Sequence, residues 1–284
     1  MLWQGRDESD NVDDRRGITG GHVAVGGGVL GVLFILAKFF LGGGNASDLQ
    51  QLVPQQQQQP QTAEQKAKED DRVHFVKVVL KDTEDVWDTL FAGMGKQYPK
   101  PKLVLYRTYT TSGCGGASQA TGPFYCPADQ ELYIDLSFAE ELKNRFNTSG
   151  DFAMAYVVAH EVGHHVQYLL GLSQKMDNLR QTLSETEYNK YSVKMELQAD
   201  FYAGIWAHYD QQMKNVIEKN DIDEALSAAN AIGDDRLQQQ AQGHITPDAF
   251  THGTSAQRMY WFKKGYDTGD LTQGNTFAGT ELSQ

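Results

Sequence analysis

Two histidines four residues apart, with a glutamate next to the first, constrain the fold of this chain most. They stand in the stretch His160-Glu161-Val162-Gly163-His164. Residues four apart on an α-helix lie on one face about one turn apart, so both imidazoles can point at a single cation. In zinc sites with this spacing the glutamate is not a ligand, and it takes a proton from the water that the metal activates. We therefore expect His160 and His164 to bind a metal and Glu161 to act as a general base.

The surrounding residues predict a buried, amphipathic helix for this motif. Ser149 or Asp151 can cap its start, and Gly171 can end it. Apolar residues recur at helical spacing, at Phe152, Tyr156, Ala159, Val162, Val166 and Leu169. His165 points about 100° away from His164, so we expect it to support the structure or a ligand rather than to bind metal. A chance match to the motif is the alternative, which a position on a buried helix disfavours.

A catalytic zinc needs a third protein ligand and leaves one position for water. Glu196 and Asp200 are the best candidates, because they too are four apart on a predicted helix. The buried side of this helix is marked by Val193, Leu197, Phe201 and Ile205, and Ser184 to Glu187 resembles a capping box at or before its start. Two buried carboxylates are costly unless a cation or a donor meets them, so we hypothesise that Glu196 binds the metal and Asp200 accepts the second N–H of a histidine. A solvated acidic face is the alternative, which the apolar neighbours disfavour.

These motifs resemble the gluzincin clan of zinc metallopeptidases, in which a second helix supplies a Glu ligand and an Asp partner. More closely, the chain resembles the bacterial neutral zinc metallopeptidase family of membrane-anchored proteins in six successive blocks: GPFYCPAD (122–129), YIDLSF (133–138), AHEVGHHVQ (159–167), MELQAD (195–200), AIGDDRLQQQ (231–240) and THGTSAQR (251–258). The resemblance implies a gluzincin-like domain with one Zn²⁺ per chain and a peptide or protein substrate. Relatives often carry two further cysteines where this chain has Phe201 and Gly274, which indicates a missing second disulfide rather than a damaged site.

The resemblance also implies roles for two regions outside the metal ligands. Gluzincins commonly place a His or Tyr donor at the substrate carbonyl oxygen, where hydrolysis develops negative charge, and His252 resembles that residue. Arg258 is expected to orient the loop of His252 by a salt bridge. Gluzincins also hold an extended substrate on an edge strand beside the metal helix, and Tyr133, Ile134 and Asp135 would belong to this strand. A plain core strand is the alternative for these three residues.

The remaining pattern predicts an α+β fold that is mainly α, with a small β-sheet and a helical C-terminal part. The folded region is expected to begin near Val73 with a helix through Leu90, and strands are expected over 102–109 and 132–138. Farther on, Asp223 is expected to cap a helical run through Arg236, and residues 256–266 are expected to form another helix. The predicted zinc metallopeptidase domain therefore covers residues 73–284.

An apolar segment precedes this domain. Val23 to Leu41 is a run of 19 residues that are all apolar or glycine except Lys38. As a helix this run would be roughly 28 Å long against a hydrocarbon core of about 30 Å, with Lys38 reaching toward the interface. We therefore expect a transmembrane helix, a signal anchor, over residues 22–41.

The charges around this segment predict its orientation. Arg6, Arg15 and Arg16 precede it, so the positive-inside rule predicts a cytoplasmic tail over residues 1–21 and places everything after about residue 44 outside. A cleaved signal peptide is the alternative. It is disfavoured because the leading region is long and acidic and no clear A-x-A site follows.

Composition adds three further expectations. Residues 42–72 contain a glutamine run between prolines and are expected to form a flexible linker. Cys114 and Cys126 fit an oxidising compartment and could form a disulfide, with inert cytosolic thiols as the alternative and a thiolate metal site disfavoured for lack of further cysteines. The formal net charge of −12, without a basic run, argues against a nucleic-acid partner.

Together these features predict a single-pass neutral zinc endopeptidase of the inner membrane, with its catalytic domain in the periplasm or outside the cell. The alternative is a non-enzymatic, metal-binding envelope module that retains the peptidase fold. An intact Glu161 favours the enzyme, because a pure binding site needs no general base.

Overall fold

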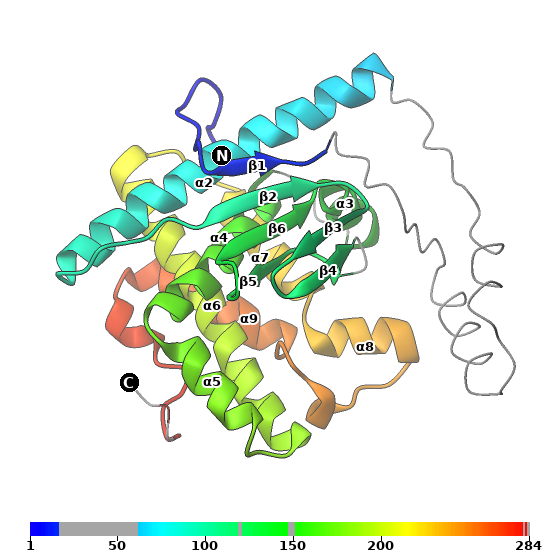
Figure 1. Ribbon diagram of the computed structural model, residues 1–284, viewed down its shortest axis with the longest axis vertical. Coiled ribbons are helices and arrows are strands. Elements are labelled where there is room, and N and C mark those ends of the chain that lie inside the picture. Colours follow the sequence, from blue (N-terminus) through cyan, green and yellow to red (C-terminus); the bar gives the residue numbers. More distant parts are fainter. Residues whose placement is uncertain (17–61, 119–120, 147–150, 281, 283–284) are drawn as a thin grey trace, which may run out of the picture. The chain divides into compact units, whose positions relative to one another are not determined.

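The computed structural model describes residues 1–16, 62–118, 121–146, 151–280 and 282 (Figure 1). The chain divides into two compact units: residues 1–16 together with 69–284, which we call the main unit, and residues 17–68. The predicted membrane helix over 22–41 and most of the predicted linker lie outside the described residues. Among the helices that the structure does describe, none is long and apolar enough for a membrane crossing.

A four-stranded sheet in the main unit has the strand order β1-β2-β6-β5. Its strands are β1 (Val12–Asp14), β2 (Lys102–Tyr106), β6 (Glu131–Asp135) and β5 (Phe124–Cys126). β1 and β6 pair with β2 in parallel, and β5 pairs with β6 antiparallel. The two predicted strands are therefore confirmed as β2 and β6. Both end early because the Asp135 carboxylate accepts the backbone N–H groups of Thr108, at 2.9 Å, and Ser137, at 2.8 Å, where the chain turns.

The sheet is buried on both faces. Alternate residues such as Leu105 and Ile134 face the helical core, whereas Val104 and Tyr133 belong to a smaller apolar cluster on the other face. That second face is completed by the antiparallel hairpin of β3 (Tyr109–Ser112) and β4 (Gly115–Ser118). The predicted disulfide between Cys114 and Cys126 is confirmed, and it joins the turn of this hairpin to β5.

β6 is an interior strand, so the expectation that it forms the edge beside the metal helix is wrong. β2 and β5 flank it, and Tyr133 lies opposite both Val104 and Phe124. The side chains of Tyr133, Ile134 and Asp135 are all buried. Three-residue β5, which is too short to show a periodic sequence pattern, occupies the edge instead.

Helices make up most of the main unit. In chain order they are α2 (Ala63–Gly93, whose first residues belong to the other unit), α3 (Phe138–Phe146), α4 (Asp151–Leu169), α5 (Leu172–Arg180), α6 (Glu185–Lys214), α7 (Asp221–Ala231), α8 (Asp234–Gln242), α9 (Ser255–Thr268) and the short 3₁₀ helices η3 (Pro247–Ala249) and η4 (Leu271–Gly274). α4, α6 and α9 agree with the predicted helices, and Ser184 with Glu187 forms the capping box at the start of α6.

The predicted helical run from Asp223 through Arg236 is two helices. α7 begins after Asn220, and the chain breaks at Gly233 before α8. A Cβ atom on Gly233 would lie 2.4 Å from the backbone nitrogen of Ser255, so α9 approaches too closely for a larger residue. Because Ser255 lies far from Gly233 in the sequence, local spacing cannot reveal the break.

Residues 1–16, which we expected to form a separate tail, are part of the main unit. β1 pairs with β2, and the Trp3 ring packs edge-on against Phe75 with 5.6 Å between centroids. The helix expected from Val73 also begins earlier, at Ala63. The predicted domain boundary at Val73 is therefore wrong, because the sheet and the α2 surface both need residues from the N-terminal end.

Glycines allow α6 and α9 to pack backbone to backbone. A Cβ atom on Gly204 of α6 would lie 2.0 Å from the carbonyl oxygen of Phe262, and one on Gly265 of α9 would lie 2.2 Å from that of Phe201. On the other side of α6, a Cβ atom on Gly163 of α4 would lie 3.0 Å from the carbonyl oxygen of Ala199. The motif helix and α9 are thereby both held against α6.

Asp210 is a buried carboxylate without a close partner. Its side chain is 0% exposed, and neither oxygen has a hydrogen-bond partner among the described residues, with Lys214 Nζ at 4.0 Å. Burial raises the pKa of Asp210, and the nearby carboxylates of Asp82 and Asp85 raise it further while Lys214 and Arg6 oppose them, giving a value of about 7. Folding therefore favours the protonated form of this group.

Replacing Asp210 with Asn should change how stability depends on pH. The unfolded chain releases this proton near the ordinary pKa of 3.8, whereas the folded chain holds it to about pH 7. In that window the wild-type free energy of unfolding should fall by about 1.4 kcal/mol per pH unit from this group, a contribution that Asp210→Asn lacks. Denaturant titrations across the window should show the stability of Asp210→Asn relative to wild type rising with pH and then levelling. A difference that does not vary with pH would contradict the assignment.

Candidate metal centre

Three donor side chains from two crossing helices converge on one point. His160 and His164 come from α4 and Glu196 from α6, and their donor atoms all lie within 4.8 Å of one another. His160 Nε2 is 3.1 Å from Glu196 Oε2, and His164 Nε2 is 3.4 Å from Glu196 Oε1. Donors about 2.0–2.1 Å from a tetrahedral zinc lie roughly 3.3 Å apart. The spacing and the N, N, O donor set therefore fit a zinc ion.

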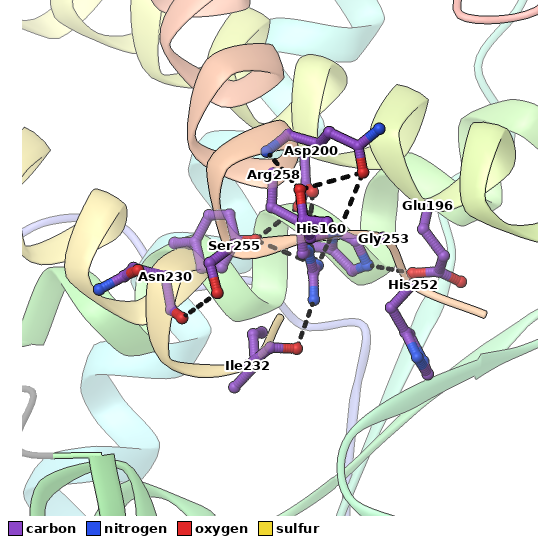
Figure 2. Close-up of polar contacts among 12 residues, drawn as sticks. His160, Glu196, Asp200, Asn230, Ile232, His252, Gly253, Ser255 and Arg258 are labelled. Atoms are coloured by element: carbon purple, nitrogen blue, oxygen red, sulfur yellow. Dashed lines mark hydrogen bonds and ion pairs between the residues drawn. The ribbon is translucent and has the colours of Figure 1, made fainter. Parts of the chain in front are cut away.

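Asp200 orients the first of these ligands. His160 Nδ1 lies 2.9 Å from Asp200 Oδ1, and because a carboxylate accepts, Nδ1 carries the proton and leaves Nε2 free to face a metal. Asp200 also accepts hydrogen bonds from Arg258 Nε at 2.9 Å and from the Tyr156 hydroxyl at 2.5 Å. Figure 2 shows Arg258 reaching from α9 toward Asp200, with Glu196 on the other side of His160. The sequence prediction for Asp200 agrees with this geometry.

Gln167 orients the second ligand, a role that we did not predict. His164 Nδ1 lies 2.9 Å from Gln167 Oε1, so this imidazole also presents Nε2 to the centre. The amide nitrogen of Gln167 donates to the backbone oxygen of Met195 at 2.7 Å and to the side chain of Gln198 at 3.2 Å. Gln167 is fully buried and lies three residues after His164, on the same helical face. That spacing is the one sequence signal that could have identified it.

Arg258 makes a salt bridge, as expected, but to Asp200 rather than within the loop of His252. Arg258 is 2% exposed. Burial raises the pKa of Asp200, but Arg258 and then His160 outweigh this effect and lower it to about 2. Asp200 is therefore ionised at neutral pH, and it remains an acceptor for His160.

The carboxylates around the two histidines favour protonated imidazoles when no metal is bound. Burial lowers the pKa of His160, but Asp200 and then Glu196 raise it to about 10, and Glu196 also raises the pKa of His164. Burial alone would raise the pKa of Glu196. The two histidines outweigh this effect and hold that pKa well below its usual range. A metal must displace protons from the imidazoles, so its binding should weaken at lower pH.

A cavity of about 460 Å³ lies beside the three donors. Glu161, which is 7% exposed, lines this cavity together with the donors, so the predicted general base faces the space that a substrate would occupy. One wall is formed by β5 and the residues before it, from Thr121 to Tyr125. The remaining lining is largely apolar and includes Phe138, Val157, Ile232 and Leu237.

His252 lies at the edge of the same cavity. Its side chain is 50% exposed, and Nδ1 is 3.2 Å from Asp234 Oδ1. The other Asp234 oxygen accepts the backbone N–H groups of Thr251, His252 and Gly253 at 2.7, 2.6 and 3.0 Å, which fixes the loop. The hydrogen bond to Asp234 raises the pKa of His252 against the effect of burial. Asp234 therefore has the loop-orienting role that we had expected of Arg258.

His165 connects the metal helix to β5. Its Nε2 is 2.7 Å from the backbone oxygen of Pro99, so this nitrogen carries the proton, and Nδ1 accepts from the Tyr125 hydroxyl at 3.0 Å. His165 is 1% exposed. It does not belong to the cluster of metal donors but positions Tyr125 in the wall of the cavity, in agreement with the supporting role predicted for it.

A family model described as "Putative neutral zinc metallopeptidase" matches residues 1–277. The chain belongs to this family. The resemblance inferred from the motifs is therefore confirmed, and family membership implies zinc as the metal and a peptide or protein as the substrate.

Relatives of this family occur in distant bacteria. Two proteins named "Uncharacterized protein YpfJ", from Escherichia coli K12 and Escherichia coli O6:H1, are 51% identical over 284 residues, which is 98% of this chain and 99% of theirs. "Uncharacterized protein Rv2575" of Mycobacterium tuberculosis H37Rv is 42% identical over 207 residues, 69% of this chain and 68% of its own. No solved structure matches the chain significantly.

Replacing Asp200 with Asn should weaken zinc binding by roughly 10- to 100-fold, because the partner that holds His160 loses its charge. Replacing Glu196 with Ala should weaken binding further, since one of three ligands is removed. Competition with a chelator of known affinity measures both effects. Asp267→Asn, on the exposed surface of α9, is the matched control and should bind zinc as wild type does. Wild-type affinity in folded Glu196→Ala would exclude the proposed ligand set.

Proposed function

We propose that this chain is a zinc-dependent endopeptidase that acts on the extracytoplasmic side. The observation that supports this most directly is the convergence of donor atoms from His160, His164 and Glu196, within 4.8 Å of one another, beside a cavity that Glu161 also lines. The Cys114–Cys126 disulfide supports an oxidising compartment. Membrane attachment through residues 22–41 is proposed from the sequence alone.

Each residue near the metal site has a distinct task in the proposed hydrolysis. Zinc, when bound, would polarise the scissile carbonyl and lower the pKa of a water molecule. Glu161 takes one proton from that water and delivers it to the leaving amine, so the carboxylate is restored at the end of each turnover. Asp200 and Gln167 hold the two imidazoles in their tautomers throughout. His252 donates toward the substrate oxygen as negative charge develops there.

β5 is the strand on which we place the substrate. It is the sheet edge that borders the cavity, and an extended peptide can pair with such an edge through main-chain hydrogen bonds. The largely apolar lining favours a peptide with an apolar side chain next to the cleaved bond. Main-chain pairing would allow variation at the other positions.

Replacing Glu161 with Gln should abolish most cleavage without loss of zinc. Removing a general base costs typically 10²- to 10⁴-fold in turnover, whereas the three ligands are unchanged. A broad peptide library analysed by mass spectrometry, with zinc measured in each preparation, tests this. Glu185→Gln at the exposed start of α6 is the matched control. Equal, background-level cleavage by wild type and Glu161→Gln would favour the non-enzymatic, metal-binding module instead.

Replacing His252 with Ala should lower turnover by roughly 10²- to 10³-fold, because a donor to the developing oxyanion is lost. Zinc content should remain that of wild type, since His252 is not among the ligands. The measurement is kcat on a peptide selected from the library, with His74→Ala, an exposed histidine of α2, as the control. Unchanged turnover would exclude the role of His252.

A further inference from the structure

Residues 1–16, which we call the N-terminal arm, are bound to the main unit along most of their length. β1 is in parallel register with β2, with Val12 opposite Leu103. On either side of that register, the backbone N–H of Leu103 donates to the oxygen of Asn11 at 2.9 Å and that of Arg15 donates to Leu105 at 2.8 Å. The arm therefore supplies one of the four strands of the sheet.

Polar side chains of the arm also bind buried carboxylates of α2. The Ser9 hydroxyl and the Asn11 amide donate to Glu84 at 2.6 and 2.7 Å, and Arg6 Nη2 donates to Asp82 at 2.5 Å. Glu84 and Asp82 are only 2% and 1% exposed. These contacts make the arm an integral part of the fold rather than a segment lying on its surface.

The chain leaves the main unit and returns to it at nearly the same place. Arg16 is the last described residue of the arm, and its Nη1 lies 2.9 Å from Asp70 Oδ1 and 3.5 Å from Glu69 Oε1. The Arg16 side chain is 15% exposed. Residues 17–68 are thus bounded on both sides by residues of one folded unit.

We infer that the N-terminal arm and the metal-binding domain occupy the same compartment, so that residues 17–68 begin and end on one side of any membrane. A helix that crossed a bilayer once between Arg16 and Asp70 would separate them by a hydrocarbon core of about 30 Å. Neither the β1–β2 pairing nor the Arg16–Asp70 ion pair could then form. A single crossing of a bilayer between Arg16 and Asp70 is therefore incompatible with the folded main unit.

The arginines that predicted the opposite topology have partners in the fold. Arg6 pairs with Asp82, Arg15 with Asp13, and Arg16 with Asp14 and Asp70. These ion pairs hold the three guanidinium groups against carboxylates of the main unit rather than leaving them available to the membrane surface. Their positive charge therefore does not require the arm to stay in the cytoplasm while the domain is exported.

A cross-linking experiment on the full chain in unlysed bacterial cells tests proximity. Arg16 and Asp70 are both replaced by Cys, a protease site is inserted within residues 55–59, and the cells are treated with a permeant bis-maleimide before lysis and cleavage. We expect the two fragments to remain joined on a denaturing gel. Arg16→Cys with Lys175→Cys, on α5, is the control and should give separate fragments. A second pair, Asp13→Cys with Lys102→Cys, spans β1 and β2 and keeps the test valid if Arg16→Cys weakens the arm.

Accessibility of the same cysteines tests the compartment. Single variants at Arg16 and at Asp70 are treated with a membrane-impermeant maleimide before or after lysis, and each site is quantified by peptide mass spectrometry so that Cys114 and Cys126 do not interfere. We expect the two positions to behave alike, either both labelled in intact cells or both labelled only after lysis. Labelling of one position alone in intact cells, or absence of both cross-links, would overturn the inference. Neither result depends on whether the protein cleaves peptides.

Discussion

The carboxylate of Asp200 is the group on which the rest of the centre depends. It lies on α6, is 0% exposed, and accepts hydrogen bonds from His160 and Tyr156 of α4 and from Arg258 of α9. A buried carboxylate is costly unless donors satisfy both oxygens, and here donors from two other helices do so. Because one of those donors is a metal ligand, the contacts that satisfy Asp200 also fix the imidazole that faces the metal.

This polar centre in turn depends on packing that involves no polar side chain. Arg258 can reach Asp200 because α9 lies against α6 at a distance that Gly204 and Gly265 alone permit. Gly163, inside the histidine motif, similarly allows α4 to approach α6 near Ala199. Gly163, at a variable position of the motif, therefore contributes to ligand geometry alongside the histidines, since it allows the two ligand-bearing helices to approach closely.

The parts of the site that sequence could predict are those set by local spacing. His160 with His164 and Glu196 with Asp200 are each four apart, and helical geometry alone places each pair on one face. Gln167 also follows this rule, but an amide carries no chemical signal that distinguishes it from a solvated residue. The partners of Arg258 and Asp234 could not be predicted, because they depend on how α9 packs against α6 and on how the loop before α9 meets the start of α8. β5 could not be predicted for a different reason: its Phe124–Cys126 span is too short to show alternation, so the family resemblance had only the longer β6 to which it could assign the edge.

The N-terminal arm shows where a rule based on composition conflicts with a fold. The positive-inside rule treats Arg6, Arg15 and Arg16 as charges beside a membrane segment, which is reasonable for a chain that is still unfolded. In the folded unit each guanidinium has a carboxylate within hydrogen-bonding distance, and Arg6 reaches one that is nearly inaccessible to solvent. Leaving the arm on the other side of a membrane would remove these ion pairs and would strip β2 of its outer strand, exposing its parallel edge. The free energy of completing the sheet therefore opposes the separation that charge counting predicts, and the folded unit can keep its full set of contacts only with both ends of residues 17–68 on one side.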